Sequence, residues 1–314
     1  MKRIGLFVAT NLAVLLLLSI IVRALGMDAW LARQGMGLDG LLGFAALVGF
    51  GGALLSLALS KWTAKKQMGV RLITEPRTSD EAWLLDAVAS HAERAGIAMP
   101  EVGIFDAAEM NAFATGARRD RALVAVSSGL LRGMTRHEAA AVLGHEIAHV
   151  ANGDMVTLAL IQGVVNTFVI SLARIIGLVL DSALGGGREA ERRRGIGPFY
   201  FLVVVVLQLV LGMFANLIVM GFSRQREFRA DAGGARLAGT ANMISALERL
   251  QTSPFAPLSV QLAAFGIAGD GASGLLRFFM SHPSLADRVA ALRAAAARHD
   301  GQSVAVPSSW RGAR

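Results

Sequence analysis

The chain has 314 residues, of which 54% are hydrophobic and only 17% are charged. A soluble domain is rarely this apolar, so the composition favours a protein with membrane-spanning segments. There is no cysteine, which excludes disulfides, thiolate metal ligands and a cysteine nucleophile. The formal net charge of +8 is more typical of basic residues beside membrane spans than of nucleic-acid binding, and we expect no nucleic-acid partner.

Four stretches are long and apolar enough to cross a bilayer, which takes about 20 helical residues. They are residues 4–22, 41–59, 155–180 and 198–222. The first follows Lys2 and Arg3 and has no clear cleavage site after it, so we expect a retained anchor. The third carries Arg174 near its end, which makes it the least certain span.

The distribution of basic residues predicts the orientation, because the cytoplasmic side carries the excess. Basic residues accumulate after the second span and again after the fourth, so both termini and the region 61–154 are expected in the cytoplasm. The connection between the third and fourth spans does not fit this orientation. It would lie outside the cytoplasm, yet it holds Arg188, Arg192, Arg193 and Arg194. A re-entrant hairpin would remove this conflict, and both arrangements stay open.

The polar regions predict a mixed fold, α+β and mainly α. Thr78 can cap a helix that reaches about residue 95, and Thr135 with Glu138 forms a capping box that opens another helix. Short strands are expected at 102–105, 111–115 and 123–126, with a polar turn at 116–121. Further helices are expected at 226–237, 241–250 and 284–297.

The capped helix carries the segment His145-Glu146-Ile147-Ala148-His149. His145 and His149 lie four residues apart on one helical face, so both imidazoles can hold one metal ion. Glu146 is poorly placed to ligate but well placed to accept a proton from a water on the metal, whose pKa zinc lowers to about 7. The alternative is a surface helix with a pH-sensitive histidine pair, and apolar neighbours such as Leu143 and Val150 argue against it.

A catalytic zinc needs a third protein ligand, which cannot be cysteine here. Glu227 and Asp231 lie four residues apart, and like charges at that spacing destabilise a helix unless both face a cation. We predict that Glu227 is the third ligand and that Asp231 accepts an N–H from a zinc-bound imidazole. The alternative for Glu227 is an ion pair with Arg224 or Arg226 beside the membrane.

With these residues in place, the sequence resembles the HtpX family of bacterial membrane-bound zinc metallopeptidases, which are related to the Ste24 and Oma1 peptidases. The resemblance rests on the HEIAH segment, the downstream Glu227 and Asp231 after two apolar spans, and the two spans before the domain. It implies a multi-pass membrane protein of the bacterial cytoplasmic membrane, with a gluzincin-like domain that binds one Zn²⁺ per subunit and faces the cytoplasm. It also implies that membrane lipid surrounds the chain and that misfolded or damaged membrane proteins are cleaved for quality control.

The resemblance implies further site residues. Asn111, Ala112, Phe113 and Ala114 resemble the strand that pairs with an extended substrate, and Asn111 would also approach the reacting centre. His282 resembles the histidine of a C-terminal His-Pro segment that helps to stabilise the oxyanion. From the residues alone, the first stretch reads as an ordinary strand, and His282 reads as a helix cap.

The predicted organisation has five consecutive parts. Residues 1–60 hold two transmembrane helices, 61–154 the first part of the cytoplasmic catalytic domain, 155–222 a transmembrane or re-entrant hairpin, 223–298 the second catalytic part, and 299–314 a disordered tail. Two other functions remain open. One is a Ste24-type prenyl-protein peptidase, which the small number of spans disfavours. The other is a non-catalytic zinc-binding scaffold, which has no use for Glu146.

Overall fold

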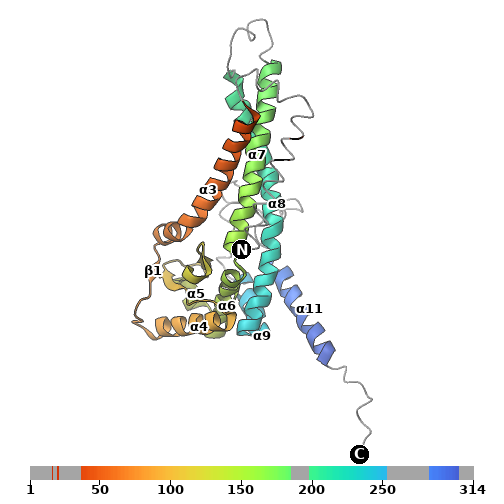
Figure 1. Cartoon of the computed structure of the whole chain (residues 1–314). Helices are drawn as coiled ribbons and strands as arrows, with labels where there is room; N and C mark the ends of the chain where they lie inside the picture. Colours follow the sequence, from red (N-terminus) through yellow and green to blue (C-terminus); the bar gives the residue numbers. More distant parts are fainter. Residues whose placement is uncertain (1–15, 17–19, 21–36, 185–197, 253–282, 304–314) are drawn as a thin grey trace, which may run out of the picture. The chain divides into compact units, whose positions relative to one another are not determined.

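The computed structural model describes residues 16, 20, 37–184, 198–252 and 283–303 (Figure 1). The chain divides into two compact units, the first holding Met1–Leu59 with Met155–Phe222 and the second Ser60–Asp154 with Ser223–Arg314. The structure is mainly helical with one small sheet, which confirms the predicted α+β class. The predicted first span at 4–22, the arginine-rich connection and His282 lie outside the described residues.

The first unit is built from long apolar helices. They are the part of α3 (Leu38–Gln67) that ends at Leu59, the part of α7 (Asp154–Leu184) that begins at Met155, and the part of α8 (Pro198–Ala238) that ends at Phe222. Within them, the ranges Asp39–Gln67, Asp154–Asp181 and Tyr200–Ala238 are long and apolar enough to cross a membrane. Three of the four predicted spans are therefore confirmed as apolar helices of spanning length.

Helices α3 and α7 pack closely where Gly49 faces Thr167. A Cβ at Gly49 would lie 2.5 Å from Thr167 Oγ1, so only glycine allows this approach. The Thr167 hydroxyl donates to the carbonyl of Gly163 at 2.8 Å, which satisfies it within its own helix. Small residues that bring backbones together are a usual way of packing helices in lipid, where no hydrophobic force acts between them.

The second unit combines the sheet with shorter helices. The strands are β1 (Arg71–Leu72), β2 (Glu101–Phe105), β3 (Ala112–Thr115) and β4 (Leu123–Ser127), in the order β1-β2-β4-β3. Only β2 and β4 are parallel, and β3 lies at an edge with its Phe113 opposite Ala125. The helices are α4 (Ser79–Ala95), α5 (Ser128–Gly133), α6 (Arg136–Asn152), α9 (Thr240–Gln251) and α11 (Leu285–Ser303), with a short 3₁₀ turn at Arg119–Arg121.

The strands and helices predicted for this unit are confirmed within a few residues, with four differences. The sequence missed β1 and α5, which are too short to show a periodic pattern. Residues 226–237 are not a separate helix but the last turns of α8, because no helix breaker lies between them and the apolar span. Helix α11 runs to Ser303, so residues 299–303 of the predicted disordered tail are helical.

Helix α6 lies in the core of this unit and packs against α4, α9, β3 and β4. Its residues Leu143 and Ile147 are fully buried beside Leu84 and Val88 of α4. His91 of α4 is buried too, and its Nε2 lies 2.9 Å from the carbonyl oxygen of Ala140. A rigid helix packed on several sides is a suitable support for a metal site, since its side chains are fixed by their neighbours.

Candidate metal centre

The ends of α6 are defined by its own sequence. Thr135 accepts a hydrogen bond from the Glu138 backbone N–H, and the Glu138 carboxylate accepts one from the Thr135 N–H, forming the predicted capping box. Gly153 ends the helix in the left-handed conformation with φ 65°, which glycine adopts without strain. The helix between these caps presents His145 and His149 on one buried face.

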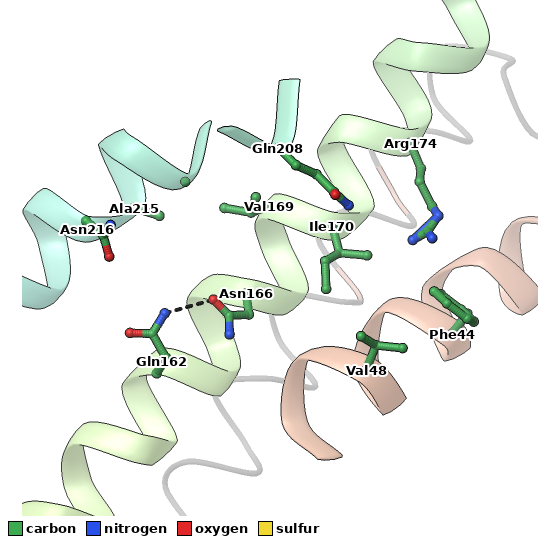
Figure 2. A pocket seen from close by; sticks show the side chains of 11 residues that line it. Phe44, Val48, Gln162, Asn166, Val169, Ile170, Arg174, Gln208, Ala215 and Asn216 are labelled. Atoms are coloured by element: carbon green, nitrogen blue, oxygen red, sulfur yellow. Dashed lines mark hydrogen bonds between the residues drawn. The ribbon is translucent and has the colours of Figure 1, made fainter. Parts of the chain in front are cut away.

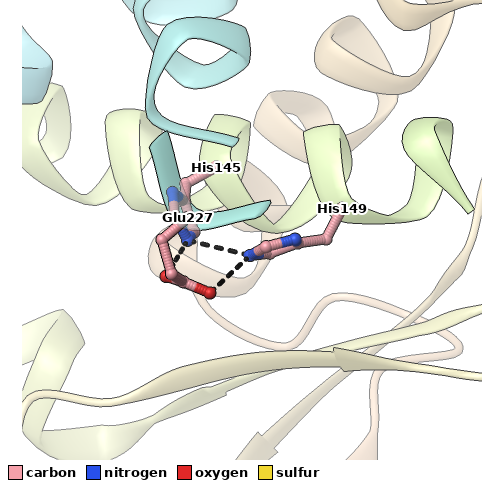
Figure 3. A group of neighbouring side chains, drawn as sticks. All are labelled: His145, His149 and Glu227. Atoms are coloured by element: carbon pink, nitrogen blue, oxygen red, sulfur yellow. Dashed lines mark hydrogen bonds and ion pairs between the residues drawn. The ribbon is translucent and has the colours of Figure 1, made fainter. Parts of the chain in front are cut away.

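The side chains of His145, His149 and Glu227 converge on one point (Figure 3). The two Nε2 atoms lie 3.1 Å apart, and each lies 3.5 Å from one carboxylate oxygen of Glu227. Tetrahedral zinc with bonds of 2.0–2.1 Å holds its ligand atoms about 3.3 Å from one another. The separation of the two Nε2 atoms, and of each from its own Glu227 oxygen (Oε2 for His145, Oε1 for His149), is therefore close to what a zinc ion requires.

Acidic residues hold the far nitrogen of each imidazole. Asp231 Oδ1 lies 2.9 Å from His145 Nδ1, and Asp154 Oδ2 lies 2.8 Å from His149 Nδ1. These carboxylates favour the tautomer with the proton on Nδ1, which leaves both Nε2 lone pairs facing each other and Glu227. Two nitrogen lone pairs at 3.1 Å repel unless a proton or a metal ion lies between them, so this donor set fits a metal ion.

Arg288 of α11 completes the charge arrangement. Its guanidinium donates to both oxygens of Asp231, at 2.8 Å and 2.5 Å, and its Nη1 lies 3.6 Å from Glu227. Nη2 also lies 3.4 Å from His145 Nδ1. The residue is buried, and a buried guanidinium is stable only when such partners neutralise it. Arg288 thus fixes Asp231, which in turn fixes the His145 ring.

Glu146 is half-buried and lies beside β3, with Ala114 of that strand as a hydrogen-bond partner and His145 and His149 close enough to act on its charge. Burial raises the pKa of its carboxyl above the ordinary value, while the neighbouring histidines and a hydrogen bond from the Ala114 backbone N–H act in the opposite direction. A raised pKa suits a group that takes up a proton from water and releases it again. The contact with Ala114 places the carboxylate beside an edge strand of the sheet.

The approach of α8 to α6 depends on two glycines. A Cβ at Gly233 would lie 2.4 Å from the Cβ of Ala148, and one at Gly234 would lie 3.0 Å from the backbone N of His145. Neither glycine has a side chain, so the two helices can come close together. Asp231 and Glu227, about one and two turns earlier on α8, therefore reach the histidines of α6. The whole centre lies within the second unit.

The other predicted residues have different surroundings. Ala112, Phe113 and Ala114 form the half-buried edge strand β3, and Asn111 precedes it as an exposed residue whose backbone N–H donates to Ser127 Oγ at 3.0 Å. His282 immediately precedes the described segment that contains Arg288, and its position is outside the description. Arg226, one of the two alternative partners of Glu227, donates to the Asp154 carbonyl and to Ser223 Oγ.

Sequence reasoning missed two residues of this centre. Asp154 had a local signal, since it follows the helix-ending Gly153 and an acid just past a ligand-bearing helix can turn back to its last histidine. Arg288 is 143 residues from His145. No spacing rule connects residues that far apart, so only the folded chain reveals this contact.

Comparisons with known proteins point to one family. The model of peptidase family M48 matches residues 78–296. The chain is 60% identical over 294 residues to a protein named Protease HtpX homolog from Thiobacillus denitrificans, covering 94% of this chain and 99% of the relative. It is 57% identical over 295 residues to Protease HtpX from Xanthomonas euvesicatoria, covering 94% and 98%.

A solved structure shares the fold. The crystal structure of Ste24p from S. mikatae aligns with 91% of this chain and 66% of that chain, with a TM-score of 0.59 and 19% sequence identity. At that identity the likeness concerns the fold alone. This chain thus spans about two thirds of the length of that structural neighbour.

Proposed function

This chain belongs to peptidase family M48 and is a membrane metalloprotease, and we propose that it is a zinc-dependent endopeptidase that cleaves misfolded or damaged membrane proteins. The observation that carries this proposal is the convergence of His145, His149 and Glu227: the two Nε2 atoms are 3.1 Å apart, and Glu227 places Oε2 3.5 Å from His145 Nε2 and Oε1 3.5 Å from His149 Nε2. Three protein ligands of the His₂Glu type are the set that catalytic zinc sites use, and they leave a fourth position for water or substrate. The three apolar helices keep the enzyme beside substrates that are already in the membrane.

Each residue of the centre has a separate role in this proposal. His145, His149 and Glu227 hold the ion, which when bound supplies a Lewis acid that polarises the scissile carbonyl and acidifies water. Glu146 accepts the proton from the attacking water and delivers it to the leaving amine. Asp231 and Asp154 keep the imidazoles in the ligating tautomer, and Arg288 holds Asp231 in place.

The edge strand β3 is the proposed binding place for the substrate chain. In the described sheet β3 pairs only with β4, so its other edge can accept an extended peptide by β-augmentation. The Ala114 N–H beside Glu146 places this strand next to the proposed base. Within this proposal Asn111, at the start of the strand, approaches the reacting centre. His282 stabilises the oxyanion.

We also propose that the second unit faces the cytoplasm, because basic residues follow the apolar stretches that lead into it. The lengths of α7 and α8 favour two full crossings over a re-entrant hairpin. The absence of cysteine makes a direct test possible. A single-cysteine variant, Arg118→Cys at an exposed site, should react with an impermeant maleimide only after cells are permeabilised. Labelling of intact cells would reverse the orientation.

The reaction is tested by Glu146→Gln in the purified, membrane-reconstituted enzyme. Zinc content measured by mass spectrometry should stay at one per chain, while cleavage of a reporter membrane protein should fall by orders of magnitude. Glu109→Gln, an exposed glutamate outside the centre, is the matched control. Undiminished cleavage by Glu146→Gln would contradict the proposal. If neither the wild-type enzyme nor the Glu109→Gln control cleaved the reporter, a non-catalytic zinc scaffold would be favoured.

Two further measurements complete the test. Glu227→Ala should lower zinc occupancy, and full occupancy would mean that another residue is the third ligand. A prenylated peptide and its unprenylated counterpart should be cleaved at similar rates. A strong preference for the prenylated peptide would favour a Ste24-type activity instead.

A further inference from the structure

A cavity of about 500 Å³ lies between α3, α7 and α8, entirely within the first unit (Figure 2). Its apolar wall includes Phe44, Val48, Val169 and Ile170. Its polar wall consists of side chains that can form hydrogen bonds: Gln162, Asn166, Arg174, Gln208 and Asn216. The cavity is large enough for a group of side chains or a small ligand.

Polar side chains of α7 and α8 are concentrated at this cavity. Between Phe201 and Phe222, α8 has only two side chains with a strong hydrogen-bonding group, Gln208 and Asn216, and both line the cavity. On α7, Gln162, Asn166 and Arg174 recur at spacings of four and eight residues and therefore share one face. Polar groups at membrane depth are costly, so their gathering in one hollow indicates a binding function.

Arg174 is the charged member of this wall. Among the described residues of the unit (37–59, 155–184 and 198–222) it is the only basic residue. Its guanidinium lies 4.3 Å from the centre of the Phe44 ring. Within the described part of the chain, its Nη1 is buried and has no hydrogen-bond partner. A cation held on an aromatic face with an unpaired donor offers an acidic or strongly polar ligand a partner.

The amides restrict what the ligand can be. Gln162 and Arg174 are 12 residues apart on α7, which is about 18 Å along the helix axis. Gln162 donates to Asn166 Oδ1 at 2.8 Å, so these two amides partly satisfy each other (Figure 2). An anionic lipid headgroup could pair with Arg174, but its acyl chains would then cover Gln208 and Asn216 and offer them no hydrogen bond. Amides both donate and accept hydrogen bonds, as peptide groups and polar side chains do. A ligand with polar groups along its length therefore fits the whole wall.

We propose that this cavity, which we call the intramembrane polar groove, binds a transmembrane segment of a substrate protein that exposes a polar or acidic side chain to lipid. The proposal rests on the proposed function and names a feature by which substrates are recognised. A correctly assembled membrane protein satisfies its intramembrane polar groups internally. A damaged one does not, so it gains hydrogen bonds from Gln208, Asn216 and Arg174 that an intact protein does not need.

The test uses the full-length enzyme in liposomes of defined composition. The substrates are three single-span reporters that differ at one mid-span position, which is Leu, Asn or Asp, and a water-soluble peptide serves as a fourth. For the wild-type enzyme, kcat/KM for the Asn and Asp reporters should exceed that for the Leu reporter about tenfold, as a good intramembrane hydrogen bond allows.

Variants of the groove should change this ratio in different ways. Gln208→Leu with Asn216→Leu should bring the Asn-to-Leu ratio to within about twofold, whereas Arg174→Leu should abolish the preference for Asp and keep that for Asn. Phe214→Leu, a change at an exposed position of the same helix, is the control that should keep both preferences. The single variants Gln208→Leu and Asn216→Leu provide the same readout if the double variant is unstable.

Each remaining outcome has one meaning. Equal cleavage of all three reporters by the wild-type enzyme, or preferences that persist in every groove variant, would overturn the inference and leave the proposed function standing. An effect of Arg174→Leu that is equal on all reporters and appears only in anionic liposomes would identify a lipid site instead. Cleavage of the soluble peptide without cleavage of any membrane reporter would overturn the proposed function together with the inference.

Discussion

Asp154 holds the ring of His149, with 2.8 Å between its Oδ2 and the imidazole Nδ1. The two residues are five apart in sequence and lie on either side of the left-handed Gly153, which turns the chain back toward the histidine. His145 is held in the same way by Asp231 of α8. Each proposed histidine ligand thus has its own carboxylate, one local in sequence and one remote.

Asp154→Asn should weaken zinc binding roughly 10–100-fold, because an amide neither fixes the Nδ1–H tautomer as firmly nor raises the basicity of the ring. Competition with a chelator, followed by measurement of bound zinc, gives the affinity. Asp120→Asn, at an exposed acid paired with Arg118, should leave the affinity unchanged. An unchanged affinity in Asp154→Asn would mean that the packing of His149 alone determines its orientation.

The Arg288–Asp231 pair predicts a large loss of stability when the guanidinium is removed. Arg288→Ala leaves Asp231 and Glu227 buried without their cation, which should cost about 3–5 kcal/mol. The unfolding temperature and the zinc content should both decrease. Arg293→Ala is the matched control on the same helix, since its pair with Glu248 is exposed and should contribute no more than about 1 kcal/mol. Equal losses of stability in Arg288→Ala and Arg293→Ala would contradict the role of Arg288 as the buried cation that neutralises Asp231.

The close approach of α6 and α8 predicts that one methyl group can disturb the metal centre. Gly233→Ala would place a Cβ 2.4 Å from that of Ala148, so the helices must separate, at a cost of about 1–3 kcal/mol. Zinc occupancy should decrease with it, because Glu227 is carried by α8. Gly221→Ala, where no atom lies within 4 Å of the new Cβ, should be neutral or slightly stabilising. A Gly233→Ala protein with normal stability and zinc content would refute the tight contact.

The titration of His149 predicts opposite effects of pH on the zinc-free and zinc-bound protein. Burial lowers the pKa of this imidazole, but hydrogen bonds to Asp154 and Glu227 outweigh it and raise the pKa to about 9. The raised folded-state pKa stabilises the zinc-free protein fully below the ordinary value of 6.5, and this stability is lost as pH rises through about 9. Because zinc must displace the proton, zinc affinity should instead rise with pH up to about 9.

Unfolding temperatures of the chelator-treated protein at pH 6 and pH 10 measure the first effect, and zinc affinities over the same range measure the second. His149→Gln removes the titrating group and should flatten the unfolding profile of the zinc-free protein between those limits. An unfolding profile that stays as steep in this variant would show that other groups are responsible.

The sequence by itself determined the features that depend on neighbouring residues. The capping box of Thr135 and Glu138, the four-residue spacing of His145 and His149 and the apolar spans follow from helix geometry and from transfer of side chains into lipid. Such local rules also gave most of the strands and helices of the second unit. They failed for β1 and α5, which are too short for a hydrophobic pattern to repeat along them.

Only the tertiary structure decided which residues surround the histidines. Electrostatic argument from the sequence directed attention to Glu227 and Asp231, but it assigned no acid to His149 and no cationic partner to Asp231. The contacts of Asp231 with His145 and Arg288 depend on how closely α8 approaches α6 at Gly233 and on where α11 places Arg288. A helix can be inferred from its own residues because its hydrogen bonds are local, whereas a buried charge cluster depends on packing between segments more than 50 residues apart in the chain.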